Sequence, residues 1–238
     1  MNTLENPENS LAPATALWPR LRRKLLAPET RLLLFWPIFE LIFMALERLR
    51  PADTQYFATH CALDDLIPFC KYAVIPYLAW FIWIPFTLFY LLWKAPRADF
   101  WRLCLPLFAG MTIALAVYVI LPNGLDLRPY RVYGSDIFAR IVRQLYSTDT
   151  ATNVCPSIHV FNSVTLMMAY YRSRIFEEPR RRWMRPASAV LCLSIIASTV
   201  LLKQHSCIDV VMGILLAMAV DSAASSLERS EYRILQNP

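Results

Sequence analysis

Long apolar segments alternate with short polar ones along most of the chain. The clearest apolar run, Tyr72 to Trp93, carries no charge, and a second run covers Leu103 to Leu121. A helix needs roughly 20 such residues to cross the hydrocarbon core of a bilayer. The pattern predicts six membrane-spanning helices, at residues 32–46, 72–93, 103–121, 157–171, 186–202 and 208–226. We therefore expect an all-α integral membrane protein built as a six-helix bundle.

The polar segments divide the chain into three parts. Residues 1–31 are expected to form a cytoplasmic tail ending in a basic interfacial segment, residues 32–227 the membrane domain, and residues 228–238 a second cytoplasmic tail. Leu17 to Ala27 mixes Trp and Leu with basic residues, which suits an amphipathic helix on the membrane surface or a simple basic flank. No cleavable signal peptide is expected, because the first apolar run begins only near Leu32. The long polar loop before the fourth span predicts a helix at Ser135 to Tyr146.

Composition and charge agree with a membrane protein. The 238 residues are 57% hydrophobic, and the net charge is +6. A basic protein can bind nucleic acid, but the Lys and Arg residues here cluster between apolar segments. Sixteen of the 24 fall on the side of the termini if six helices span the membrane. The positive-inside rule then predicts that both termini lie in the cytoplasm. We expect an integral plasma membrane protein with no nucleic-acid partner.

Two of the three histidines lie at the predicted outer ends of spans. His205 and Asp209 are four positions apart, so they would share one face of a helix. A carboxylate there can hold one imidazole nitrogen and leave the other as a nucleophile. The alternative is an ordinary polar pair at a helix end. His60 falls in a loop and is expected to have no catalytic role.

A second candidate string is Cys155-Pro156-Ser157-Ile158-His159. Proline forces the residue before it into an extended conformation, so a helix is expected to begin at Ser157. The N-terminus of a helix favours phosphate. Ser157 can cap this helix or donate to a phosphate oxygen, and His159 can protonate a leaving alkoxide. A capped helix with an interfacial histidine is the alternative.

Two cations lie close to these strings in the sequence. Arg128 precedes Pro129, and its guanidinium can hold two phosphate oxygens at once. Lys203 lies two residues before His205. The alternatives are a surface arginine beside Asp126 and an interfacial lysine anchor.

The six cysteines give no metal site. They show no CxxC and no metal-ligand spacing. Cys61 and Cys70 share one predicted outer loop, where a disulfide between them is left open. Neither a metal nor another cofactor is therefore expected.

Together these strings resemble the type 2 phosphatidic-acid phosphatase superfamily of membrane enzymes. That family carries K-x6-R-P, P-S-G-H and S-R-x5-H-x3-D, matched here over roughly residues 103–220 by Arg128-Pro129, Pro156-Ser157-Ile158-His159, and Ser198 with His205 and Asp209. The resemblance implies that His205 becomes a phosphohistidine, that Asp209 orients it, and that His159 is the general acid. The phosphate-binding residues would be Arg128, Ser157, Ser198 and Lys203. No metal is implied.

Three positions depart from the family pattern. Leu121 stands in place of the lysine of the first motif, Ile158 in place of the glycine of the second, and Thr199 in place of the arginine of the third. Two of the family's cations are therefore missing. Lys203, about one helical turn after Thr199, is the candidate to replace one of them.

The favoured function is a membrane phosphatase that hydrolyses lipid phosphate or pyrophosphate monoesters at the outer leaflet. A second hypothesis follows from the string from His205 to Val210, which is similar to sphingolipid and inositol-phosphorylceramide synthases. Those relatives pass a phosphorylated head group to a lipid alcohol. A third is a transporter, in which Glu40 at membrane depth would carry protons, or an inactive family member. The expected partners are a lipid phosphate or phospholipid and the bilayer, with the oligomeric state left open.

Overall fold

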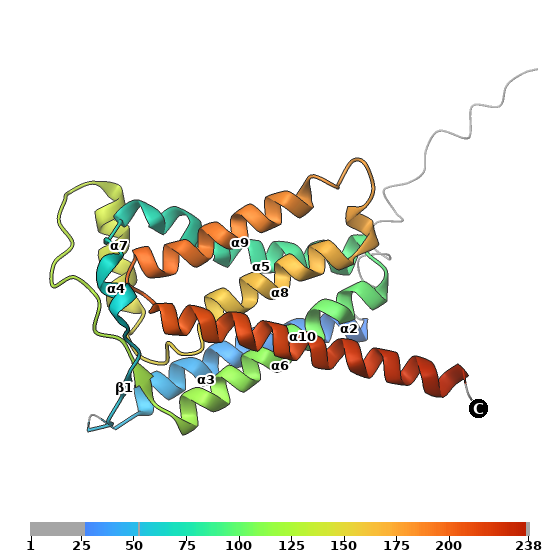
Figure 1. The fold of residues 1–238 in the computed structure, drawn as a ribbon, viewed down its shortest axis with the longest axis horizontal. Helices are drawn as coiled ribbons and strands as arrows, with labels where there is room; N and C mark the ends of the chain where they lie inside the picture. The colour runs from blue at the N-terminus through green and yellow to red at the C-terminus, as the bar shows by residue number, and fades with distance from the viewer. Residues whose placement is uncertain (1–26, 52, 237–238) are drawn as a thin grey trace, which may run out of the picture.

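Helices that run side by side make up most of the molecule (Figure 1). The computed structural model describes residues 27–51 and 53–236. The long helices there are α3 (Phe35–Leu49), α5 (Val74–Lys94), α6 (Arg97–Ile120), α8 (Ile158–Arg172), α9 (Met184–Leu201) and α10 (Cys207–Gln236). The predicted all-α class is confirmed. The predicted interfacial segment at 17–27 lies, apart from Ala27, outside the described residues.

Within the described residues, four segments are long and apolar enough to cross a membrane: Lys71–Lys94, Arg97–Ile120, Met184–Leu201 and Cys207–Glu228. They correspond to the second, third, fifth and sixth predicted spans. The helices at the first and fourth, α3 and α8, have 15 residues each, which is about 22 Å of helix at 1.5 Å per residue. The chain is therefore a membrane protein by its apolar helices, and the six-span count stays a prediction.

The helix α8 lies inside the bundle and packs against α5, α6, α9 and α10. Its polar side chains are compatible with burial because Ser163 and Thr165 donate to the carbonyls of His159 and Phe161 (2.7 and 2.9 Å). On α6, Gly110 lets the two helices approach, since a Cβ there would lie 2.0 Å from the Phe161 ring. The helix that carries His159 is thus held on several sides.

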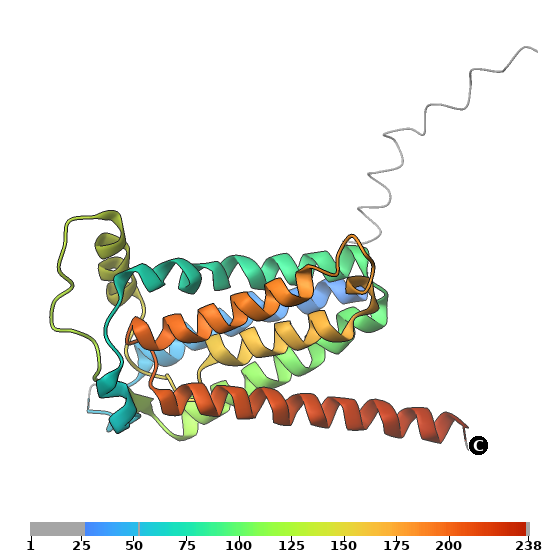
Figure 2. The same ribbon diagram turned by 45° about the horizontal axis from the view of Figure 1, so that its top comes forward.

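Short elements cover one end of the bundle (Figure 2). Strand β1 (Phe57–Ala58) pairs in parallel with β2 (Asn123–Gly124), and α4 (Ala62–Leu66) and α7 (Ile137–Thr148) lie at the same end. The predicted helix at Ser135 begins at Ile137 instead, because Asp136 caps it by accepting the N–H groups of Phe138 and Ala139. The remaining short elements are α2 (Pro28–Arg31), η3 (Leu32–Leu34), η4 (Lys71–Ala73) and η5 (Arg174–Phe176).

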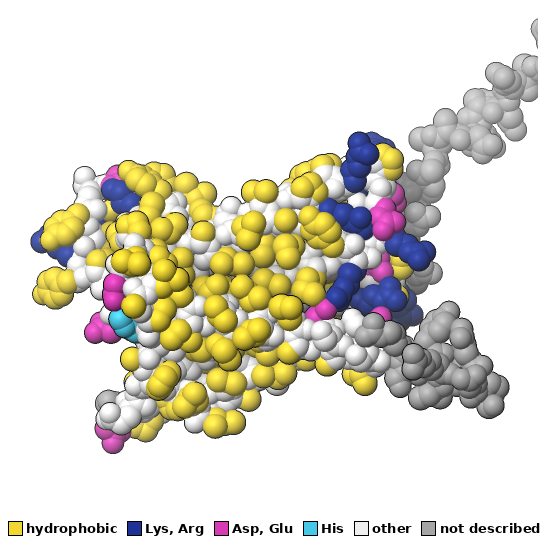
Figure 3. Space-filling model, in the orientation of Figure 1, with side chains coloured by type: hydrophobic (Ala, Val, Ile, Leu, Met, Phe, Trp, Pro, Cys, Tyr) yellow, Lys and Arg dark blue, Asp and Glu magenta, His cyan; other side chains and the backbone are white. Residues whose placement is uncertain are grey.

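The opposite end of the bundle is rich in Lys and Arg (Figure 3). There α5 connects to α6, and α8 connects to α9 through the basic segment 173–183. Ion pairs join the helices at this end, for example Arg102 with Glu228 (3.0 Å) and Arg172 with Asp221. The two ends of the bundle therefore differ in chemistry, with basic side chains at one and the covering elements at the other.

Candidate active site

His205 lies in the turn between α9 and α10. The N–H groups of Lys203 and Gln204 donate to the carbonyls of Val200 and Thr199 (3.1 and 2.9 Å). These two bonds form the Schellman arrangement that ends many helices. Lys203 takes the left-handed position of the motif, with φ 54°, where glycine is usual. The turn stops α9 and places His205 directly before the next helix.

Asp209 is positioned as part of a helix cap. Ser206 precedes α10; its N–H donates to Asp209 Oδ2 (2.7 Å), and the Asp209 N–H donates to Ser206 Oγ (3.2 Å). This is the reciprocal capping box of a helix N-terminus. Asp209 Oδ2 also lies 3.6 Å from His205 Nδ1, which is longer than a hydrogen bond. The predicted pair does come together, but His205 stands before the helix rather than on its face.

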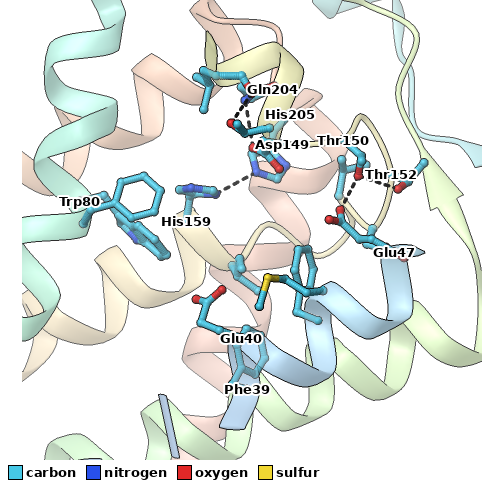
Figure 4. A pocket seen from close by; sticks show the side chains of 18 residues that line it. Phe39, Glu40, Glu47, Trp80, Asp149, Thr150, Thr152, His159, Gln204 and His205 are labelled. Carbon is cyan, nitrogen blue, oxygen red and sulfur yellow. Dashed lines mark hydrogen bonds between the residues drawn. The ribbon is translucent and has the colours of Figure 1, made fainter. Parts of the chain in front are cut away.

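His159 lies in the first turn of α8 and faces His205 (Figure 4). Its Nδ1 is 3.3 Å from His205 Nε2. Its ring packs on Tyr77 and Trp80 of α5, with centroids 4.7 and 4.3 Å away. His159 Nε2 has no hydrogen-bond partner among the described residues, although the residue is only 8% exposed. The two motif histidines, distant in sequence, therefore share one buried site.

A glycine on α10 allows the two helices to meet at this site. A Cβ on Gly213 would lie 2.7 Å from the carbonyl oxygen of Ser157 and 3.1 Å from Val160 Cβ. Ser157 donates its N–H to the carbonyl of Asp209 (3.1 Å), and its hydroxyl accepts the N–H of Val160 (3.3 Å). Ser157 is thus the N-cap of α8, which begins one residue later than predicted.

Asn123 holds the segment that leads into α8. Its Oδ1 accepts the N–H groups of Val154 and Cys155 (both 2.8 Å). Its Nδ2 donates to the carbonyls of Leu121 (3.0 Å) and Cys155 (2.9 Å). The residue is 1% exposed. Sequence reasoning missed it, because a single asparagine beside a glycine reads as an ordinary turn.

A cavity of about 260 Å³ opens beside the two histidines (Figure 4). It is lined by residues of α3, α5, the end of α7, the segment 149–154, the start of α8, and the turn before α10. Among the described residues, this lining includes no Lys or Arg. Its acids and aromatic residues are Glu40, Glu47, Asp149, Phe39, Phe43, Trp80 and Phe81.

The acids of this lining were not predicted as site residues. The sequence marks Glu40 only as an acid at membrane depth and does not single out Glu47. Glu47 follows Glu40 by seven positions on α3, and this spacing places both on one face of a helix. That spacing was a usable signal. Asp149 offered none, since it lies in a loop.

Asp149 connects the cavity to the turn that holds His205. Its Oδ2 accepts hydrogen bonds from Gln204 Nε2 (3.0 Å) and the Tyr77 hydroxyl (3.2 Å). Burial raises the pKa of Asp149 above its ordinary value, and the charges of Arg128 and His205 offset part of that rise. Asp149 thus joins the wall of the cavity to the turn before α10 through hydrogen bonds from neutral side chains.

Arg128 lies one layer behind the cavity. It donates to the carbonyls of Asp149 (2.9 Å) and Thr150 (3.0 Å), and to the side-chain oxygen of Gln204. Its guanidinium also stands 4.6 Å from the ring centroid of Tyr146. Arg128 thus braces three residues of the cavity wall, Asp149, Thr150 and Gln204, without lining the cavity itself.

The other two predicted phosphate ligands point elsewhere. The Ser198 hydroxyl donates to the carbonyl of Ile195 within α9 (2.6 Å). The Lys203 ammonium donates to the carbonyl of Asp64 in α4 (2.7 Å). The structure therefore brings together His159, His205 and Asp209, whereas the side chains of Ser198 and Lys203 bond main-chain carbonyls.

The cysteines all lie in the described part of the chain and are free thiols. Cys61 lies beside Cys207 and Asp64, with their ligand atoms within 4.8 Å of one another. Such a group has side chains that can bind a metal. Both Asp64 oxygens already accept backbone N–H groups, from Cys61 (2.9 Å) and Cys207 (2.8 Å). These hydrogen bonds explain the group as a structural contact between the start of α4 and the start of α10.

Comparison with known proteins supports an enzymatic role for this chain. The family model of the PAP2 superfamily matches residues 103–231, which is more than half of the chain. The match contains His159, His205 and Asp209. It indicates a membrane protein with an activity of the phosphatase or phosphotransferase type. No curated protein and no solved structure matches the chain.

Proposed function

The chain belongs to the PAP2 superfamily, and from this premise we propose that it removes a phosphoryl group from a membrane lipid through a phosphohistidine on His205. The observation that carries the proposal is the placement of the His205 ring. Its Nε2 faces His159 at 3.3 Å, and its Nδ1 faces Asp209 at 3.6 Å. One nitrogen is thus beside a second imidazole, and the other is beside a carboxylate.

The carboxylate of Asp209 favours the proton on His205 Nδ1. The lone pair then lies on Nε2, which can attack phosphorus. Phosphorylation at Nε2 leaves the ring positively charged, and the nearby carboxylate stabilises that charge. The capping box fixes Asp209 for this role, so its position does not depend on the substrate.

His159 would protonate the oxygen that leaves phosphorus and then take a proton from the attacking water. The two rings are too close at 3.3 Å to hold a phosphorus centre between them, so entry of substrate must move them apart. His159 lines the cavity and its Nε2 has no hydrogen-bond partner among the described residues, so this ring is free to change its contacts. The N-terminus of α8 offers favourable electrostatics for phosphoryl oxygens.

The roles proposed for Arg128, Ser157, Ser198 and Lys203 as phosphate ligands rest on the family resemblance. Of these residues, Arg128 contacts the cavity wall through its hydrogen bond to Gln204, which lines the cavity. We propose that the basic end of the bundle faces the cytoplasm and that the site with the two histidines faces the outer side of the plasma membrane. The gathering of Lys and Arg at the end opposite the histidines supports that orientation (Figure 3).

The test is to trap the phosphoenzyme. Purified protein is incubated with lipids labelled with ³²P at phosphorus and quenched in alkali, in which phosphohistidine is stable. We expect label on the wild type, none on His205→Asn, and a loss of turnover of more than about 10³-fold in that variant. His60→Asn is the matched control, because His60 is a half-exposed histidine bonded to Asp65. Full turnover in His205→Asn would refute the assignment of His205 as the nucleophile.

The same preparation separates the alternatives. Phosphate or a phosphorylated head group released to water identifies a hydrolase. A new phospholipid, formed when diacylglycerol or ceramide is added, identifies the head-group transferase. A transporter would form no phosphoenzyme with any of these lipids.

A further inference from the structure

The charge of the cavity is the opposite of what a phosphate monoester needs. Glu40, Glu47 and Asp149 line it, and no Lys or Arg does among the described residues. Glu47 accepts a hydrogen bond from Thr150, and Asp149 accepts bonds from neutral groups only. Glu40 has no hydrogen bond or ion pair in the described part of the chain. In the described part of the chain no Lys or Arg side chain forms a salt bridge with these three acids, although the charge of Arg128 acts on Asp149 and Glu47 from a longer distance.

The cations that could compensate are occupied elsewhere. Arg128 donates through its two terminal nitrogens to the carbonyls of Tyr146, Asp149 and Thr150 and to Gln204, while its Nε has no hydrogen-bond partner among the described residues. The Lys203 ammonium donates to the carbonyl of Asp64. The two family cations are replaced by Leu121 and Thr199. A monoester with up to two negative charges would face three carboxylates here, which is unfavourable in a partly buried site.

Aromatic side chains form the rest of the wall. Trp80 and Phe81 come from α5, and Phe39 and Phe43 come from α3. Aromatic faces attract organic cations, and carboxylates beside them add to the attraction. His159 Nε2 marks the same cavity as a ligand site, because it is buried, lines the cavity and has no partner.

We propose that the cavity binds the head group of a phosphodiester lipid that carries an amino-alcohol cation, ethanolamine or choline. The ammonium lies among Glu40, Glu47 and Asp149, and phosphorus lies at His205. This inference rests on the proposed function and identifies its lipid substrate as such a diester in place of a phosphate monoester. The single negative charge of the diester is then balanced by the cation of the same molecule.

The reaction follows from this placement. The His205 Nε2 lone pair forms a bond to phosphorus, the bond from phosphorus to the glycerol oxygen breaks, and that oxygen takes a proton from His159. Diacylglycerol leaves to the bilayer, and the phosphorylated amino alcohol stays on His205. Water then adds to phosphorus, its proton passes to His159, and the bond between phosphorus and nitrogen breaks. The products are diacylglycerol and phosphoethanolamine or phosphocholine.

The experiment compares four lipids with identical dioleoyl chains in mixed micelles of the full-length protein. They are phosphatidylethanolamine, phosphatidylcholine, phosphatidylglycerol and phosphatidic acid, and diacylglycerol is the product measured for each. For at least one of the two lipids with a cationic head group, we expect kcat/KM to exceed the kcat/KM of both anionic lipids by about tenfold or more. Phosphatidylethanolamine and phosphatidylcholine are compared separately. A preference for the primary ammonium of ethanolamine indicates binding by the carboxylates, and a preference for the quaternary ammonium of choline indicates binding by the aromatic rings.

Two variants test the acids directly. Glu40→Gln and Glu47→Gln keep the shape of the side chain, and each should lower the ratio of kcat/KM between the cationic lipid and phosphatidylglycerol by about tenfold. Glu178→Gln, at the opposite end of the bundle, is the matched control and should leave the ratio unchanged. Melting temperatures in detergent show whether each variant is folded.

The outcomes separate this inference from the proposed function. Labelled His205 with phosphatidic acid or phosphatidylglycerol as the best substrate refutes the head-group inference and leaves the phosphohistidine standing. A ratio that neither variant changes also refutes the inference. No label and no turnover with any of the four lipids refutes both.

Discussion

The ammonium of Lys203 donates a hydrogen bond to the main-chain carbonyl of Asp64, 2.7 Å away. This bond ties the turn before His205 to the helix α4, which covers the same end of the bundle. Lys203 also takes a left-handed backbone conformation, with φ 54°. A residue predicted to hold phosphate is thus placed where it ends one helix and anchors another.

Lys203→Gly should be more stable than Lys203→Ala by about 1 kcal/mol. Both variants lose the bond to Asp64, but glycine adopts the left-handed conformation without the strain that alanine suffers there. Melting temperatures of the two purified variants in one detergent give the difference. The reverse order would contradict the assigned role of this turn.

Arg128→Lys should lower kcat by about tenfold or more with little change in KM. A lysine cannot span the carbonyls of Asp149 and Thr150 and the amide of Gln204, so the wall beside His205 loses its brace. Steady-state kinetics make the distinction, because loss of a direct phosphate contact would raise KM as well. A rise in KM at constant kcat would support a phosphate ligand instead.

Asn123→Asp should destabilise the protein by about 2 kcal/mol and reduce turnover. The substitution replaces a buried donor by an acceptor opposite the carbonyls of Leu121 and Cys155, which are then left unsatisfied. Gln144→Glu makes the same chemical change at an exposed position of α7 and serves as the control. Equal melting temperatures for these two variants would show that Asn123 does not hold the segment before α8.

Asp64 should make the stability of the protein sensitive to acid. Burial acts to raise its pKa, but the N–H groups of Cys207 and Cys61 outweigh burial and hold the pKa below its ordinary value. A lowered pKa contributes stability above the unfolded value, about 3.9, and this stability is lost as pH falls through the folded value. The melting temperature should fall below about pH 4.

Asp64→Asn isolates this contribution. Its loss of melting temperature between pH 5 and pH 3 should be smaller than that of the wild type by about 3 °C. Asp65→Asn is the neighbouring control, since that carboxylate is 63% exposed and bonds the half-exposed His60. An equal loss of melting temperature in the wild type and Asp64→Asn would show that Asp64 does not cause the acid sensitivity.

Much of the fold was predictable because apolar runs are long and polar turns are short. The structure has a helix at each predicted span, and the family match covers the strings around His159 and His205. The prediction was less exact where local caps decide the boundaries. Ser206 starts α10 after His205, and Asp136 starts α7 two residues later than the apolar pattern suggested.

The lining of the cavity was not predictable in the same way. Glu40 and Glu47 reach the histidines from more than 100 residues away in sequence, and only tertiary packing brings α3 to that place. The partners of Arg128 and Lys203 are carbonyl groups, which carry no signal in the amino-acid type. A cation near a motif in sequence therefore did not reveal whether it faces substrate or backbone.

Gly213 leaves no side chain between α10 and the first turn of α8. The distance between the two imidazoles therefore depends on how closely these two helix backbones approach each other. A side chain at this position would push the start of α8 away from α10 and separate His159 from His205 without touching either ring.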